Sequence, residues 1–287
     1  MLPRTQLVLR RFTVGNGQEV DEMEAGTEPV KAEVTRVDII RGLRDVGLGL
    51  GAAVLMHSSL SSMGHVDGGA DAVISALLEV VGPDGLASVP THTWGTVNAR
   101  QPVFHVRLSP SIVGQITEVF RHRPDALRSR HPTHSVAAIG RRSAEYVRDH
   151  ELAETPCGRE SPYGRLCAWG GYVLFLGVQL NTWTLMHAFE EWAPVPWIFN
   201  RWEHLYTVLE DGTVIPVPSR RHNPDPDCRR DYLALEPLLQ RHGLIRYGRI
   251  GDATLRLVDA AGAERLLLPR MREDSDLVLK RRSRPVV

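Results

Sequence analysis

The chain has 287 residues, of which 43% are hydrophobic and 24% charged, as is usual for globular proteins. Its 34 basic residues balance 34 acidic ones, so the charge balance indicates no broad electrostatic surface for nucleic acid or a membrane. Cys157, Cys167 and Cys228 show no CxxC spacing, which argues against a disulfide framework and a zinc ribbon. There is no signal-peptide pattern, and no window approaches the roughly 18 apolar residues of a membrane span. We therefore expect a cytoplasmic protein.

The two ends of the chain differ in composition from the middle. Residues 1–34 are polar and show no sustained period, so we expect a loosely attached or poorly ordered extension with at most one short strand at 7–9. The basic run 280–284 is explained by a solvated tail, which places a basic tail at 281–287. Residues 35–280 are expected to form a single α/β domain.

The middle of the chain alternates predicted helices with buried strands. Thr35 has the position of an N-cap, and the helical spacing that follows it stops at Gly47. Further helices are predicted at 70–81, 109–120, 143–149 and 232–241, strands at 51–56, 86–90, 136–139 and 172–178, a hairpin at 202–217 that turns at Asp211-Gly212, and short strands with turns after 241. This alternation predicts an α/β fold of three layers, with a mixed, largely parallel central sheet, flanking helices and a smaller C-terminal elaboration of strand and helix.

The segment 56–69 joins a predicted strand to a predicted helix. It is the first segment whose residues suit a role in binding or catalysis. It is crowded with serines and glycines, which leave hydroxyls and backbone amides free. Amides at the positive end of a helix are suited to holding a phosphate. The segment matches neither a Walker loop nor GxGxxG, so a plain strand-to-helix connection is the alternative explanation.

The segment 128–135 contains His131 and His134, whose spacing suggests a metal site. Pro132 prevents a regular helix here, and no third ligand of matching kind lies nearby in the sequence. A basic, hydroxyl-bearing loop that contacts an anionic cofactor, or a packed turn, explains the segment better.

The segment 181–192 follows the clearest buried strand. If it is helical, His187 shares a face with the carboxylates three and four residues on, Glu190 and Glu191. A carboxylate beside an imidazole fixes its tautomer and raises its basicity, as a general base requires. A surface ion pair on an amphipathic helix is the alternative.

In their order and spacing, four stretches together resemble the aminoglycoside 3-N-acetyltransferase family. They are 57–64 followed by Gly68-Gly69; 82–91; 131–138; and 161–166, which leads into the strand ending at 178 and the helix with His187 and Glu190. The resemblance covers roughly residues 36–279.

The resemblance implies an enzyme that acetylates the 3-amino group of an aminoglycoside by direct attack on acetyl-coenzyme A, without a metal. It implies that His187 is the catalytic base, paired with Glu190, and makes Ser135 a candidate for steadying the thioester oxygen. The residues expected to bind coenzyme A are His57, Ser58, Ser59, Leu60, Ser61, Ser62, Met63, Gly64, Thr91 and His131.

The sequence departs from the family pattern just before the helix histidine. Trp183-Thr184 stands where family members commonly carry Asn-Thr. An indole can stack on a sugar face or a cation, and acids suit a polycationic acceptor. We therefore expect Trp183, Glu191 and Glu160 to bind the acceptor.

Three other functions remain open at this point. The acceptor could be another amine, such as an aminosugar or a nucleotide-like metabolite. A metal-dependent hydrolase could be built on His131, His134 and His187, and a catalytically silent binding protein could retain the fold. No nucleic-acid or membrane partner is expected, and a homodimer is left open.

Overall fold

The computed structural model describes residues 6–13, 19–26, 33–222 and 229–280. Its contacts divide the chain into two units, residues 1–33 and 34–287. The predicted basic tail at 281–287 lies outside the described residues. Within the described part, no helix has the length and apolar character needed to cross a membrane.

The first unit contains a β-hairpin where the sequence predicted at most one short strand. Strands β1 (Gln6–Thr13) and β2 (Glu19–Gly26) pair antiparallel over their whole length. The prediction missed β2 because its acid-rich sequence lacks the alternating apolar residues that mark a strand. The hydrogen bonds that pair two strands need only backbone groups.

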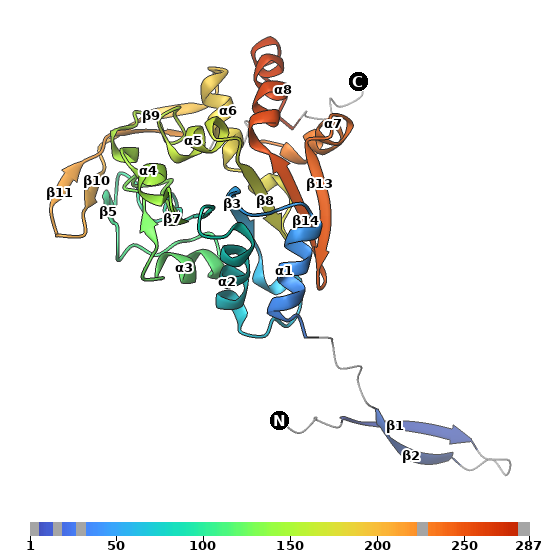
Figure 1. Cartoon of the computed structure of the whole chain (residues 1–287). Helices are drawn as coiled ribbons and strands as arrows, with labels where there is room; N and C mark the ends of the chain where they lie inside the picture. The colour runs from blue at the N-terminus through green and yellow to red at the C-terminus, as the bar shows by residue number, and fades with distance from the viewer. Residues whose placement is uncertain (1–5, 14–18, 27–32, 223–228, 281–287) are drawn as a thin grey trace. The chain divides into compact units, whose positions relative to one another are not determined.

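The second unit is built on a sheet of seven strands (Figure 1). The strand order is β13 (Ile245–Ile250), β14 (Ala253–Asp259), β8 (Tyr172–Leu176), β3 (Ala53–Ser58), β4 (Leu86–Pro90), β7 (Val136–Gly140) and β6 (Leu127–Arg128). The pairs β8–β3 and β3–β4 are parallel and the other four are antiparallel. The predicted α/β fold with a mixed sheet is confirmed, with a smaller parallel part than expected because antiparallel strands flank the parallel ones on both sides.

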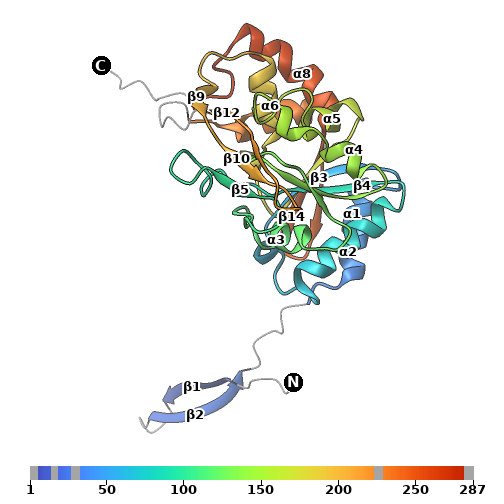
Figure 2. The same ribbon diagram turned by 90° about the vertical axis from the view of Figure 1, so that its left-hand side faces the viewer.

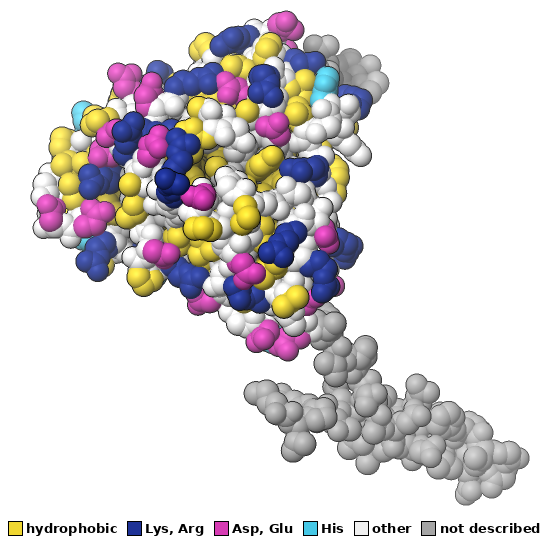
Figure 3. All heavy atoms as spheres, in the orientation of Figure 1, with side chains coloured by type: hydrophobic (Ala, Val, Ile, Leu, Met, Phe, Trp, Pro, Cys, Tyr) yellow, Lys and Arg dark blue, Asp and Glu magenta, His cyan; other side chains and the backbone are white. Residues whose placement is uncertain are grey.

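Helices cover both faces of this sheet and complete the predicted three layers (Figure 2). One face carries α1 (Arg36–Asp45), α2 (Gly69–Val81) and α3 (Gln115–Arg121); the other carries α4 (Ser143–Val147), α5 (Pro162–Ala168), α6 (Leu185–Trp192) and α8 (Ala260–Glu273). Each face has its own apolar cluster, as expected for a sheet buried on both sides. In Figure 3, basic and acidic side chains are intermixed over the visible face, in keeping with the balanced charge.

The sequence predicted the start of helix α1 correctly and that of helix α3 incorrectly. Thr35 caps α1 as predicted, and its hydroxyl accepts the Asp38 N–H. The predicted start of the next helix at Ser109 is wrong. Ser109 Oγ instead accepts the His105 N–H at 2.8 Å and closes a turn. Gly114, at φ 126°, then immediately precedes the helix at Gln115.

The end of the chain contains a helix that the sequence analysis missed. Helix α8 is capped by Asp259, whose carboxylate accepts the Gly262 N–H, and it continues through Pro269. The prediction of short strands and turns after 241 is therefore wrong for this part. Proline usually ends a helical pattern, but packing against α5 and α6 supports this one.

Two small sheets lie beside the main sheet. One orders β11 (Val214–Pro216), β10 (Tyr206–Val208) and β5 (Val103–His105), and the other pairs β9 (Phe199–Glu203) with β12 (Ser219–His222). The hairpin turning at Asp211-Gly212 is confirmed for β10 and β11. The predicted helix 232–241 is a 3₁₀ turn, η5 (Tyr232–Leu235), followed by α7 (Glu236–Arg241).

Candidate active site

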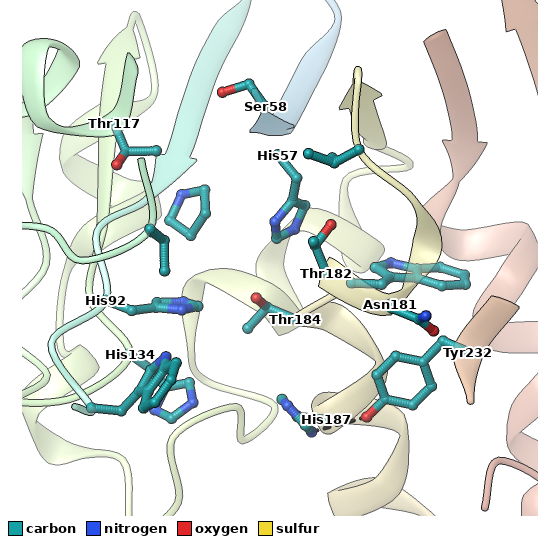
Figure 4. A pocket seen from close by; sticks show the side chains of 15 residues that line it. His57, Ser58, His92, Thr117, His134, Asn181, Thr182, Thr184, His187 and Tyr232 are labelled. Carbon is teal, nitrogen blue, oxygen red and sulfur yellow. Dashed lines mark hydrogen bonds between the residues drawn. The ribbon is translucent and has the colours of Figure 1, made fainter. Parts of the chain in front are cut away.

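A cavity of about 410 Å³ opens at the carboxyl ends of the three parallel strands (Figure 4). Strand β3 lies between β8 and β4, so the chain changes direction across the sheet at this place. In open α/β sheets this position is the usual ligand site. The cavity is lined by His57, Ser58, Pro90, His92, Trp94, Val113, Thr117, His134, Val178, Asn181, Thr182, Trp183, Thr184, His187 and Tyr232.

Helix α6 brings the predicted imidazole–carboxylate pair to this pocket. His187 Nδ1 lies 2.9 Å from Glu190 Oε2, so the two residues share a helix face as the spacing predicted. Glu190 is completely buried, whereas the His187 side chain remains 22% exposed. Since the carboxylate accepts a hydrogen bond from Nδ1–H, Nε2 carries the lone pair that can take a proton.

Two residues from a distant part of the chain also hold Glu190. The Tyr232 hydroxyl donates to Oε1 at 2.6 Å, and Arg230 Nε donates to both oxygens at 3.1 and 3.2 Å. Burial raises the pKa of Glu190, but His187, Arg230 and Tyr232 outweigh it and bring the pKa below its usual value. The sequence analysis missed Arg230 and Tyr232, because no spacing relates them to α6.

Other histidines surround His187. The rings of His222 and His134 have centroids 4.5 and 6.4 Å from that of His187. Burial is the main cause that lowers the pKa of His222, and it holds those of His92 and His134 well below the usual value. These rings are therefore neutral near pH 7.

The wall made by the end of β3 presents polar atoms without partners. His57 Nε2 and Ser58 Oγ are buried and make no hydrogen bond in the described part of the chain. The His57 ring stacks on Phe175, and burial lowers its pKa to about 3, so it is neutral. Buried polar groups are normally bonded, so these atoms are suited to contact a ligand.

The remainder of the predicted coenzyme loop leads away from the pocket. Residues 60–63 form the 3₁₀ turn η1, and Ser62 Oγ donates to the Ser59 carbonyl at 2.7 Å. The turn packs closely on Gly177, where an added Cβ would lie 1.7 Å from Ser62 Oγ. Of the predicted set Ser59, Leu60, Ser61, Ser62, Met63 and Gly64, none lines the pocket.

Three other predicted residues lie beneath the pocket. Ser135 Oγ lies 3.0 Å from Thr91 Oγ1, and both accept from the buried Arg128 Nε. The His131 ring is fully buried, with Nε2 3.2 Å from Ser219 Oγ and Nδ1 accepting the His134 N–H. None of the three lines the pocket.

The residues predicted to bind the acceptor occupy different places. Trp183 lines the pocket but is fully buried, with its ring edge-on to Phe175 and its Nε1 unbonded among the described residues. Glu160 is exposed outside the pocket, and Glu191 is enclosed beside Cys157 and His222. Sequence reasoning missed His92, which lies two residues after the end of β4 and lines the same pocket as His57.

A metal site is poorly supported in the described part of the chain. The one suitable group there is Cys157, Glu191 and His222, which differs from the set His131, His134 and His187 of the alternative hydrolase hypothesis. Both Glu191 oxygens already accept hydrogen bonds. His222 Nδ1 lacks the hydrogen-bond acceptor that usually supports a metal-binding imidazole.

The comparisons with known proteins agree with this architecture. A family model described as aminoglycoside 3-N-acetyltransferase matches residues 55–271. Aminoglycoside N(3)-acetyltransferase VII of Streptomyces paromomycinus is 35% identical over 257 residues, which are 79% of this chain and 88% of that protein. The chain therefore belongs to the aminoglycoside 3-N-acetyltransferase family, and the predicted resemblance and enzyme class are confirmed.

Solved structures extend this likeness to the fold. The crystal structure of aminoglycoside acetyltransferase AAC(3)-Xa has a TM-score of 0.73 and 32% identity, covering 84% of this chain and 94% of that one. A structure described as AAC-IIIb binary with CoASH has a TM-score of 0.74 and 27% identity, covering 84% and 97%. Acetyl-coenzyme A is the co-substrate of aminoglycoside acetyltransferases, as the resemblance implied.

Proposed function

We propose that this chain transfers the acetyl group of acetyl-coenzyme A to an amino group of an aminoglycoside, at the 3-amino position by family likeness. Its family and the described likeness to a coenzyme A complex support this proposal. The observation that carries the mechanism is the His187–Glu190 pair, with Glu190 buried and His187 facing the pocket.

In this mechanism His187 Nε2 accepts a proton from the acceptor ammonium, and the freed amine attacks the thioester carbonyl carbon. The tetrahedral intermediate then collapses with cleavage of the carbon–sulfur bond. The amide forms as its nitrogen releases a second proton to solvent, and the proton held by His187 passes to the departing thiolate, which leaves as the thiol of coenzyme A. Direct transfer in a ternary complex needs no covalent enzyme intermediate, so Cys157 and Cys167, both buried, take no part.

The unpartnered atoms opposite His187 fit the acetyl donor. His57 Nε2, Ser58 Oγ and Trp183 Nε1 can donate to the amide and carbonyl oxygens of an acetylated pantetheine arm. A neutral imidazole held by burial provides such a donor without adding charge. The loop 59–64 outside the pocket would then contact the more exposed phosphate end of the coenzyme.

A different amine as acceptor is the second candidate function. Within the described residues, the pocket lining contains no carboxylate, and Glu191 and Glu160 lie elsewhere. A carboxylate lining is what a polycationic acceptor would favour. Thiol release should therefore be measured with acetyl-coenzyme A against a panel of aminoglycosides, simple aminosugars and nucleotide-linked amines. Release with none of the aminoglycosides would contradict the first candidate, and release with another amine would establish the second.

A further inference from the structure

Glu190 contacts the Arg230 guanidinium as well as His187, and this changes what it can do for His187. The carboxylate is fully buried and lies between the His187 imidazole and the Arg230 guanidinium. With His187 neutral, the three groups carry no net charge, because Arg230 balances Glu190. Without the guanidinium, the groups described around the buried carboxylate would leave it to be balanced by a protonated His187 or by its own protonation.

The other groups facing His187 do not add charge. Tyr232 approaches Nδ1 at 3.2 Å while donating to Glu190, and burial is the main cause that keeps its pKa well above the usual value. His222 on β12 and His134 before β7 are neutral, and Glu191 behind His222 accepts its Nε2–H at 2.7 Å. Arg230 is thus the cation in direct contact with the catalytic carboxylate.

We infer that Arg230 is a positioning residue which, acting through Glu190, sets the pH at which His187 becomes able to accept a proton. The inference rests on the proposed function, since it gives His187 the part of general base. Glu190 fixes the tautomer and orientation of the His187 ring. Arg230 partly neutralises the carboxylate and so limits how strongly Glu190 stabilises the protonated form of that ring. Removing the positive charge should make the His187–Glu190 pair take up a proton at higher pH.

The test compares two uncharged variants with one charged variant. Arg230→Gln removes the charge, Arg230→Met also retains an apolar stem near the Trp197 ring, and Arg230→Lys retains the charge. The pH dependence of kcat/KM is measured from pH 5 to 9 with acetyl-coenzyme A and the best acceptor. The midpoint of the acid limb should rise by about one pH unit in both uncharged variants and stay within about 0.3 unit in Arg230→Lys.

Arg256→Gln is the matched control. Arg256 Nε donates to Glu236 at 2.8 Å, with side-chain exposure of 17%, close to the 16% of Arg230, and it does not line the pocket. This control should lower thermal stability without moving the acid limb. An unchanged or lower midpoint in a folded Arg230→Gln or Arg230→Met variant would overturn the inference.

A second measurement separates this inference from the proposed function. Imidazole NMR titration without substrates follows His187 directly, with the signal assigned by its absence in His187→Ala. A midpoint that rises in the uncharged variants supports the inference even if His187→Ala retains turnover, which would contradict the proposed general base. A midpoint unmoved by the loss of Arg230, with turnover lost in His187→Ala, overturns the inference alone.

Discussion

Helix α6 carries two consecutive glutamates that differ in what they hold. Glu190 bonds His187, whose ring faces the pocket and keeps a free nitrogen. Glu191 bonds the Thr155 hydroxyl, the Cys157 N–H and His222, and its side chain is only 3% exposed. Neighbours on a helix point about 100° apart, so two adjacent carboxylates enter different surroundings. A carboxylate–imidazole pair therefore marks a reactive site only where its ring also reaches a cavity.

The largest effect should come from the pair that reaches the pocket. His187→Ala is expected to lower kcat by about a hundredfold or more, which is the usual effect of removing a general base. Coenzyme A affinity, from calorimetry, and the thermal midpoint should change little. The acid limb of the pH–rate profile should also disappear. Near-normal turnover would contradict the proposed mechanism.

The two glutamates should then differ in their effect on kcat, although both are buried acceptors whose loss destabilises the fold. Glu190→Gln is expected to reduce kcat about tenfold, because the ring loses its carboxylate but retains Nε2. Glu191→Gln should leave kcat within about threefold but lower the free energy of unfolding by about 1–3 kcal/mol, since buried donors lose a charged acceptor. Steady-state kinetics and urea unfolding of both variants measure the difference. Equal losses of kcat in the two variants would contradict the proposal that Glu190, and not Glu191, supports the catalytic base.

The buried histidines should make stability fall with acid. Burial lowers the pKa of His57 to about 3 and that of His150 to about 4, below the unfolded value of 6.5. The unfolded chain therefore binds more protons, so this stability is complete above pH 6.5 and is lost as pH falls toward 4. These two residues alone should each cost on the order of 1 kcal/mol at pH 5.5.

Urea unfolding at pH 7.5 and 5.5 measures this loss. His150→Gln, which removes one buried imidazole, should lose less stability between the two pH values than the unmodified chain. Equal stability at both pH values would show that the histidine interior does not stay neutral as described.

The smallest effect is expected on the wall opposite His187. Ser58→Ala removes a hydroxyl that has no partner in the described part of the protein, so folding should be unaffected or slightly improved. If the hydroxyl contacts the acetyl donor, KM for acetyl-coenzyme A should rise about three- to tenfold, with kcat changed less. Ser88→Ala is the control, because its hydroxyl donates to the Val54 carbonyl inside the sheet and should affect stability instead. An unchanged KM in Ser58→Ala would exclude the contact.

Local signals in the sequence were sufficient to predict many of the helices, strands and turns. The cap at Thr35, the strand at 86–90 and the turn at Asp211-Gly212 depend on neighbouring residues, and all three were predicted. The His187–Glu190 contact is similarly local, because helical spacing alone brings the two together. The hairpin partner at 19–26 and helix α8 were missed, since pairing and packing override weak or proline-containing patterns.

The sequence by itself determined the order of strands and helices, the family and the identity of the pair on α6. Only the tertiary structure decided which polar residues reach the cavity. It brings Arg230 and Tyr232 onto Glu190 from about 40 residues away in the chain and encloses Glu191, Ser135 and His131. Periodicity reports which face of an element is buried, but long-range contacts depend on how separate elements cross, and no local pattern encodes that.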